Sequence, residues 1–156
     1  MYVHAKVVVV DDVWAMVGSD NLNRRSWSHD SELSIGVLDA EPDAREPRDP
    51  AGLGDGARVF ARDLRLRLSC EHLDRDPGDV ADLLDPMDTF AAFRRQAAQL
   101  AAWHDGGGTG ERPPGRVLPH QIYRPTAAQR WWAAPLYRLV YDPDGRPLRD
   151  RVRGRL

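Results

Sequence analysis

Residues 3–32, VHAKVVVVDDVWAMVGSDNLNRRSWSHDSE, decide the fold of this 156-residue chain. Residues 2–10 are mostly apolar and rich in β-branched valine, residues 11–12 are two aspartates that signal a turn, and residues 13–17 form a second apolar run. This order predicts a β-hairpin. Because residues 7–10 are apolar on both faces, we expect the first strand to be buried from both sides.

The pattern changes after the hairpin, where Gly-Ser-Asp-Asn interrupts the apolar run. Asp20 or Ser19 can cap a short helix that runs to about Arg25, because a side-chain oxygen at this place accepts from free backbone N–H groups. Residues 33–38 predict another strand. Residues 39–56 are rich in Asp, Glu, Pro and Gly, and this composition predicts a solvated loop.

Helices are expected in the middle of the chain. In residues 57–73, leucines and arginines recur at the spacing of an amphipathic helix. Residues 80–84 predict a short helix, and Pro86 can open another one over about residues 87–103. The remainder has many prolines with aromatic residues between them, which predicts an irregular tail with one extended segment at residues 136–141.

These elements together predict an α+β fold with α/β layering, in which the hairpin is part of a mixed sheet and helices flank that sheet. A length of 156 residues suits one domain with a real core. We divide the chain into residues 1–40 with the strands and the polar loop, 41–56 as a loop, 57–105 as the helical part of the same domain, and 106–156 as an irregular proline-rich tail.

Composition and charge exclude several classes of protein. The 22 basic and 24 acidic residues give a net charge of -2, so no overall positive field recruits nucleic acid and phosphate recognition must be local. The apolar runs of the hairpin, residues 7–10 and 13–17, are far shorter than the ~20 residues of a transmembrane helix. A single cysteine, Cys70, rules out an internal disulfide and suits a reducing compartment. We therefore expect a cytoplasmic protein, or one peripheral to the membrane.

Some other residues admit two interpretations. Asp11 and Asp12 could be metal ligands, but adjacent carboxylates in a turn are usually solvated and no second cluster completes a site, so no metal is expected. The arginines of residues 57–73 could form a stripe that faces lipid, but a solvated helix face is favoured. Trp131 and Trp132 could anchor at a membrane interface, but packing in the core or the tail is favoured.

Residues able to carry chemistry gather around the hairpin. In a strand, residues i and i+2 point to the same face, so His4 and Lys6 project side by side about 7 Å apart and one phosphate can touch both. The histidine can act as a nucleophile or as a general acid and base, and the lysine can neutralise developing charge. Ser19 and Asn21 add neutral donors. Glu32 is the carboxylate that we expect to hold the imidazole.

The hairpin and the loop after it form one spaced motif: His4-x-Lys6, four residues, Asp11, six residues, Gly18-Ser19-x-Asn21. At every position this motif resembles the HKD signature of the phospholipase D superfamily. Residues 30–32 (Asp-Ser-Glu) and 71–73 (Glu-His-Leu) also resemble its phosphatidylcholine-cleaving members. The resemblance is to the C-terminal half of a two-motif enzyme. It covers about residues 2–105 and is specific over residues 4–32.

In that family two HKD motifs, from two halves of one chain or from two subunits, form one active site. One histidine attacks phosphorus to give a phosphohistidine, the other protonates the leaving alcohol, and water or another alcohol then takes the phosphatidyl group. The resemblance implies a phospholipid substrate at a membrane surface and no cofactor. It implies these roles: His4, Lys6 and Asp11 as the catalytic motif, Ser19 and Asn21 for phosphate binding, and Glu32 to orient the histidine. The place of Asp11 at a strand end favours a turn or supporting role.

The chain departs from the family pattern in two ways. Only three residues precede His4, where a complete half has several strands and helices, and no second HxK pattern occurs. We therefore expect a truncated or split gene product that needs a second HKD half, in trans or from upstream. A non-catalytic remnant or assembly half and a cardiolipin synthase-type phosphatidyltransferase stay open as alternatives, and a nuclease is the least favoured.

Overall fold

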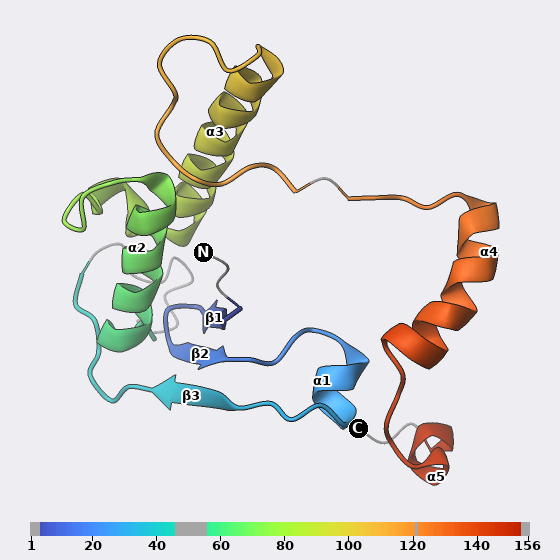
Figure 1. Ribbon diagram of the computed structural model, residues 1–156. Helices are drawn as coiled ribbons and strands as arrows, with labels where there is room; N and C mark the ends of the chain where they lie inside the picture. The colour runs from blue at the N-terminus through green and yellow to red at the C-terminus, as the bar shows by residue number, and fades with distance from the viewer. Residues whose placement is uncertain (1–3, 46–55, 121, 154–156) are drawn as a thin grey trace. The chain divides into compact units, whose positions relative to one another are not determined.

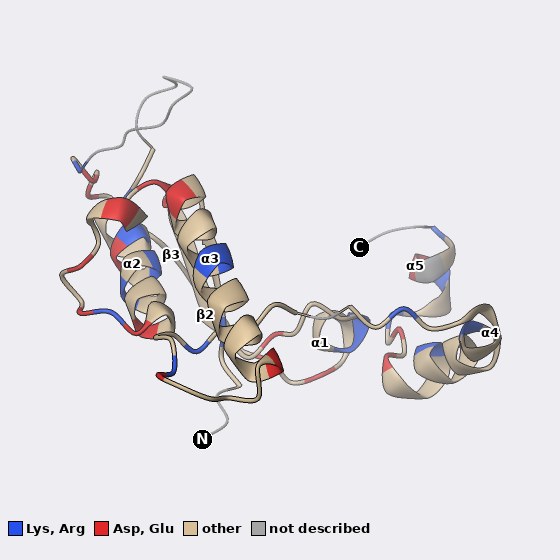
Figure 2. Ribbon diagram, turned by 90° about the horizontal axis from the view of Figure 1, so that it is seen from above, with Lys and Arg blue, Asp and Glu red and all other residues tan. Residues whose placement is uncertain are grey.

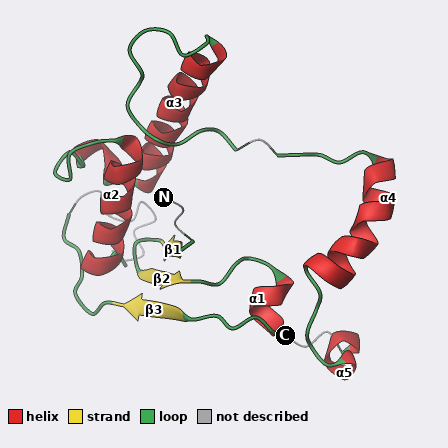
Figure 3. Ribbon diagram, viewed as in Figure 1, coloured by secondary structure: helices red, strands yellow, loops and turns green. Residues whose placement is uncertain are grey.

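The computed structural model describes residues 4–45, 56–120 and 122–153 (Figure 1). The elements, in chain order, are β1 (Lys6–Val10), β2 (Trp14–Gly18), α1 (Arg24–Ser28), β3 (Ser34–Leu38), α2 (Val59–Leu73), the 3₁₀ turn η1 (Ala81–Leu83), α3 (Pro86–Asp105), α4 (Ala127–Leu136), the π-helix η2 (Tyr137–Tyr141) and α5 (Leu148–Val152). All the described strands precede the long helices (Figure 3). The predicted α+β class is confirmed.

The strands form an antiparallel sheet in the order β1-β2-β3. The predicted hairpin is confirmed, and its turn is closed by the Val13 N–H, which donates to the carbonyl oxygen of Val10 at 2.9 Å. Asp11 and Asp12 have φ values of 52° and 55°, a left-handed conformation in which aspartate is more common than most residues. Positive φ at both central residues matches the twist of two-residue hairpins.

Strand β1 is less buried than the sequence predicts. Val7 and Val10 are 38% and 45% exposed, so the expectation that residues 7–10 are buried from both sides is wrong for the described structure. The physical reason is the position of β1. It is an outer strand of the described three-stranded sheet, and its apolar pattern does not distinguish an edge from a centre.

The chain divides into two compact units. The core unit comprises Val8–Ala15 and Gly36–Gln121 and holds the main hydrophobic cluster. The site unit comprises Met1–Val7, Met16–Ile35 and Ile122–Leu156. All the predicted site residues except Asp11 belong to the site unit.

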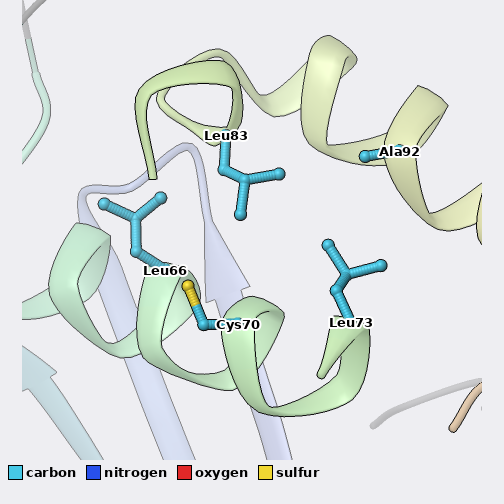
Figure 4. Close-up of a cluster of buried hydrophobic side chains, with 5 residues drawn as sticks. All are labelled: Leu66, Cys70, Leu73, Leu83 and Ala92. Atoms are coloured by element: carbon cyan, nitrogen blue, oxygen red, sulfur yellow. The ribbon is translucent and has the colours of Figure 1, made fainter. Parts of the chain in front are cut away.

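The hydrophobic cluster of the core unit lies between α2, η1 and α3 (Figure 4). Leu66, Cys70 and Leu73 of α2 point toward Leu83 of η1 and Ala92 of α3, and none of the five is more than 3% exposed. Complete burial of one leucine stabilises a fold by roughly 1.5–3 kcal/mol. The helices predicted over residues 57–73 and from Pro86 onward are thus confirmed. Burial raises the pKa of the Cys70 thiol, as befits a core residue.

A buried ion-pair cluster joins the hairpin turn to α2. Asp12, which is 3% exposed, accepts from Arg62 Nε at 3.1 Å and from Nε and Nη2 of Arg65 at 2.6 and 2.7 Å. Arg65 also donates to the carbonyl oxygens of Leu83 and Leu84 at 2.7 and 2.8 Å. One guanidinium therefore connects the turn, α2 and the end of η1.

This cluster corrects two expectations. A solvated role is wrong for Arg62, which is 4% exposed, and for Asp12. A buried carboxylate needs opposite charge and hydrogen bonds, and two arginines spaced three residues apart on one helix face supply both. Arg67, on the same helix, is exposed as predicted.

The C-terminal part is helical over residues 127–141, so the prediction of an irregular tail is wrong there. Thr126 Oγ1 accepts from the Gln129 N–H at 3.3 Å, and Gln129 Oε1 accepts from the Thr126 N–H at 2.8 Å. This reciprocal cap starts α4. The extended segment predicted at residues 136–141 is the π-helix η2, which follows Pro135 inside α4. A proline removes a backbone donor and so disturbs the regular hydrogen-bond ladder.

The loop predicted over residues 39–56 is described only in part. Pro42 and Arg58 form an isolated antiparallel bridge, and residues 46–55 lie outside the described residues. Among the helices that the structure describes, none combines the length and the apolar character that crossing a bilayer requires.

We expect Asp12→Asn to lower the free energy of unfolding by about 3–5 kcal/mol, because it removes the buried carboxylate that pairs with both Arg62 and Arg65. Asp11→Asn is the matched control, since both positions have positive φ, which asparagine tolerates, and Asp11 is exposed. Urea unfolding followed by circular dichroism measures the difference. Equal unfolding midpoints for the two variants contradict the structural role of Asp12.

Candidate functional site

His4 and Lys6 are in contact in the site unit. Lys6 Nζ lies 2.9 Å from Nδ1 and 2.8 Å from Nε2 of His4. Lys6 begins β1 and His4 precedes it by two residues, so extended backbone places both side chains on one face, as the sequence predicts. A neutral imidazole has one N–H and one lone pair, so the ammonium can donate a hydrogen bond to only one of the two ring nitrogens at a time. The pair thus offers a cation and a proton acceptor at one place.

Gly18 ends β2 where the chain passes very close to β3. A Cβ built on Gly18 lies 1.8 Å from Oγ and 2.7 Å from Cα of Ser34, so only glycine fits this position. The Ser19 N–H donates to the carbonyl oxygen of Leu33 at 3.0 Å, and the Ser34 hydroxyl donates to the Asp20 carboxylate. These contacts hold the loop after β2 against the start of β3.

Glu32 accepts hydrogen bonds from two serine hydroxyls. Ser19 Oγ donates to Oε2 at 2.5 Å, and Ser26 Oγ donates to Oε1 at 2.6 Å. These two hydrogen bonds, Ser19 first, hold the pKa of Glu32 below its ordinary value of 4.5, and the charges of Lys6 and His4 lower it by smaller amounts. Glu32 is therefore an anion within electrostatic range of the His4–Lys6 pair. That it orients the imidazole stays a prediction.

Sequence reasoning missed Asn23 and Ser26. Asn23 Oδ1 accepts from the Ser26 N–H at 2.8 Å and caps α1, so the predicted cap at Asp20 or Ser19 is wrong. Those two side chains are engaged elsewhere, because Ser19 donates to Glu32 and Asp20 accepts from β3. The preference of asparagine for helix starts is a signal that could have placed the cap. The contact between Ser26 and Glu32 has no comparable sequence signal.

The C-terminal segment also supports α1. Asp142 is 6% exposed, its Oδ1 accepts from the backbone N–H of Arg25 at 2.9 Å, and its carbonyl oxygen accepts from Arg24 Nη2 at 2.7 Å. A carboxylate at the start of a helix satisfies backbone donors there and favours the helix dipole. Because α1 carries Ser26, this contact supports the helix that supplies one donor to Glu32. Nothing in the sequence linked Asp142 to this helix.

The two remaining predicted site residues, Asn21 and Asp11, are not part of these hydrogen-bonded contacts among the described residues. Asn21 is half-buried in the loop after β2, and Asp11 is exposed in the hairpin turn and belongs to the core unit. The structure thus brings His4 to Lys6 and Ser19 to Glu32. An ammonium in contact with an imidazole suits a tetrahedral oxyanion, because the ammonium offsets the charge of the oxyanion and the imidazole can exchange a proton with it.

Comparison with known proteins gives one family and several relatives. Residues 1–45 match the family model described as "Cardiolipin synthase, PLD-like domain". The chain is 39% identical over 87 residues to phospholipase D zeta 1 of Arabidopsis thaliana, covering 56% of the chain and 8% of that protein. It is 40% identical over 92 residues to phospholipase D1 of Mus musculus, again covering 56% of the chain and 8% of that protein.

A further relative is phospholipase D alpha 1 of Nicotiana tabacum, 37% identical over 75 residues, with 47% of the chain and 8% of that protein covered. The chain therefore spans less than a tenth of the length of these curated relatives. No solved structure gives a significant match.

Gly18→Ala is expected to lower the free energy of unfolding by roughly 1–3 kcal/mol, because the added methyl group overlaps both the side chain and the backbone of Ser34. Gly78→Ala is the control, since a Cβ at Gly78 meets nothing within 4 Å. Chemical denaturation of both variants measures the effect. A Gly18→Ala protein as stable as the Gly78→Ala protein is inconsistent with the close approach of β2 and β3.

Ser19→Ala or Ser26→Ala is expected to raise the pKa of Glu32, because each hydroxyl donates to the charged form of the carboxylate. A carbon-detected NMR titration of the Glu32 carboxyl measures the change. Ser28→Ala is the control, because the Ser28 hydroxyl lies on the same helix but donates to the Arg24 carbonyl oxygen. An unchanged Glu32 pKa in both serine variants rules out the network.

The lowered pKa also sets the sign of a pH effect. A carboxyl group with a lower pKa in the folded than in the unfolded chain stabilises the fold above its unfolded pKa. For Glu32 this stabilisation is present above about pH 4.5 and is lost as the pH falls through the folded-state pKa.

Proposed function

Because this chain belongs to the phospholipase D superfamily, we propose that it is the C-terminal catalytic half of a phospholipase D-type phosphodiesterase acting on glycerophospholipids. The observation that carries the proposal is the contact of Lys6 with both ring nitrogens of His4 at 2.8–2.9 Å. A cation and a proton-transfer group at one place are what cleavage of a phosphodiester requires. The enzyme works from the cytoplasm at a membrane surface.

The substrate phosphate binds through its non-bridging oxygens. The ammonium of Lys6 offsets their charge, and the amide of Asn21 donates to them. The hydroxyl of Ser19 donates to Glu32 in the free site. When substrate binds, this hydroxyl rotates and donates to the phosphate instead. Glu32 is then free to accept from the imidazole of His4 and to hold that ring. Asp11 stabilises the hairpin turn and does not contact the phosphate.

The reaction has two steps. A histidine of the second HKD half attacks phosphorus, the bond from phosphorus to the head-group oxygen breaks, and protonated His4 gives its proton to the departing alcohol. His4 then takes a proton from water, whose oxygen attacks the phosphohistidine and releases phosphatidic acid. This use of one histidine as acid and then as base is general acid–base catalysis, and the phosphohistidine is a covalent intermediate.

The proposal requires a second histidine, and it comes from another HKD half. The chain contains one HxK pattern, at residues 4–6, whereas this mechanism uses one histidine on each side of the phosphorus. The second half is another part of the same protein or a partner subunit. If no such half exists, the chain is the non-catalytic remnant that the sequence left open.

Phosphatidyl transfer is a second candidate activity, because the family model that matches residues 1–45 carries the name cardiolipin synthase. The covalent intermediate is the same, and an alcohol replaces water in the second step. Product analysis with glycerol or phosphatidylglycerol as the acceptor separates the two activities. Formation of a new phosphodiester instead of phosphatidic acid indicates transfer.

His4→Ala and Lys6→Ala are each expected to lower release of the head group from phosphatidylcholine vesicles by at least about a hundredfold, because general acid–base catalysis by His4 and charge stabilisation by Lys6 each contribute about that much. Release is measured with the purified chain, both alone and mixed with a separately produced N-terminal HKD half. His120→Ala is the control, because His120 is exposed and lies outside the motif.

Two outcomes separate the alternatives. Release only after the second half is added supports a split enzyme, and release by the chain alone supports assembly of two copies. No release in either case, at any protein concentration, contradicts the proposed activity and favours the remnant.

A further inference from the structure

The structure leaves an aromatic region exposed near the C-terminus. Residues 122–141, the aromatic segment, comprise the approach to α4, α4 itself and η2, drawn in orange and red in Figure 1. Its aromatic residues are all between 49% and 83% exposed: Tyr123, Trp131, Trp132, Tyr137 and Tyr141. The expected packing of the two tryptophans in a core or tail is therefore wrong. α4 contains no buried residue.

The apolar residues of α4 lie along one side of the helix. Positions 128, 131, 132, 135 and 136 follow the i, i+3, i+4, i+7, i+8 pattern of a single face. The less exposed positions, Gln129 and Ala133, are spaced four residues apart and lie on a different side. This apolar face is exposed within the site unit, where Trp131 is 83% and Leu136 is 56% exposed.

The charge of the aromatic segment differs from that of the chain. Residues 122–141 contain Arg124, Arg130 and Arg138 and no aspartate or glutamate, although the whole chain has a net charge of -2. On α4 the basic position is blue and no position is red (Figure 2). Such a surface, with apolar rings and only positive charge, is complementary to a binding partner that has negative charges on its outside and an apolar layer directly below them.

A bilayer that contains anionic lipids has these properties. Tryptophan and tyrosine rings favour the boundary between head groups and acyl chains, and arginines near the surface are attracted by anionic head groups. A protein partner could bury the apolar face as well. The lipid surface is favoured over a protein partner because the segment carries five aromatic rings, three arginines and no acidic residue. A protein interface does not require that all the charges on one side be positive.

We propose that the aromatic segment binds the interface of bilayers containing anionic lipids, with the face of α4 that carries Trp131 and Trp132 inserted among the head groups. This inference rests on the proposed function only in that a phospholipid-cleaving enzyme meets its substrate at a bilayer. The segment keeps the protein at that surface between encounters with substrate. Its binding requires neither His4 nor Lys6.

The test is cosedimentation with vesicles of phosphatidylcholine, with and without phosphatidylglycerol. We expect the protein to bind the anionic vesicles more tightly, with affinity falling as salt rises. The double substitution Trp131→Ala with Trp132→Ala should reduce binding at least tenfold. Arg130→Ala should reduce it about fivefold, since one arginine near an anionic surface contributes about that factor. Tryptophan emission should shift to the blue on binding in the wild-type chain and not in the double variant.

The control is a double substitution on α3, Met87→Ala with Phe90→Ala, which removes two apolar side chains that are 72% and 58% exposed. It should leave vesicle binding unchanged. His4→Ala should also bind like the wild-type chain, so that loss of catalysis and loss of membrane binding are told apart. Circular dichroism confirms that each variant is folded, which we expect because the replaced side chains are exposed.

Three results overturn the proposal. The first is no binding to anionic vesicles, and the second is equal loss of binding in the α4 and α3 double variants. The third is self-association in sedimentation velocity runs that the tryptophan substitutions abolish while vesicle binding persists, which makes the face of α4 a contact between copies of the chain.

Discussion

The carboxylate of Asp12, buried between Arg62 and Arg65, is the interaction on which the core unit depends. The left-handed turn between β1 and β2 directs this side chain inward, and α2 supplies both arginines from one face. Arg65 also donates to the carbonyl oxygens of Leu83 and Leu84 at the end of η1 and to the hydroxyl of Thr89 in α3. A buried charge is costly unless it is paired and hydrogen-bonded, so turn, helix and η1 can adopt only arrangements that satisfy all these groups together.

The site unit follows a different principle, because its parts are short and depend on side-chain hydrogen bonds. Helix α1 has five residues, far fewer than an isolated helix needs to be stable in water. The Asn23 cap, the contact between Ser26 and Glu32, and the carboxylate of Asp142 hold it. Glu32 thereby has two tasks, to organise the loop after β2 and to present negative charge near an imidazole and an ammonium.

Several features were predictable because their causes are local. Val-rich runs around two aspartates indicated the hairpin, and the leucine spacing together with Pro86 indicated the long helices. The prediction of an irregular tail is wrong over α4 because proline content does not report the reciprocal cap of Thr126 and Gln129, which starts this helix. The prediction that β1 is buried on both faces is wrong because hydrophobic patterning does not report how many strands lie beside a given strand. The spacing from His4 to Asn21 led to the family, since a motif records chemistry that does not depend on the order of the surrounding elements.

The sequence by itself indicated the kind of protein: an α+β chain with a motif that resembles the phospholipase D superfamily, in which His4 and Lys6 share one face of extended backbone. Period-two geometry places residues i and i+2 together whatever the rest of the chain does. Only the tertiary structure decided which aspartate of the turn is buried, which serines hold Glu32, and that Asp142 supports α1. These contacts join residues 6 to 117 positions apart, and local propensity carries no information about such pairs. The same holds for Trp131 and Trp132, whose exposure depends on what else packs against α4.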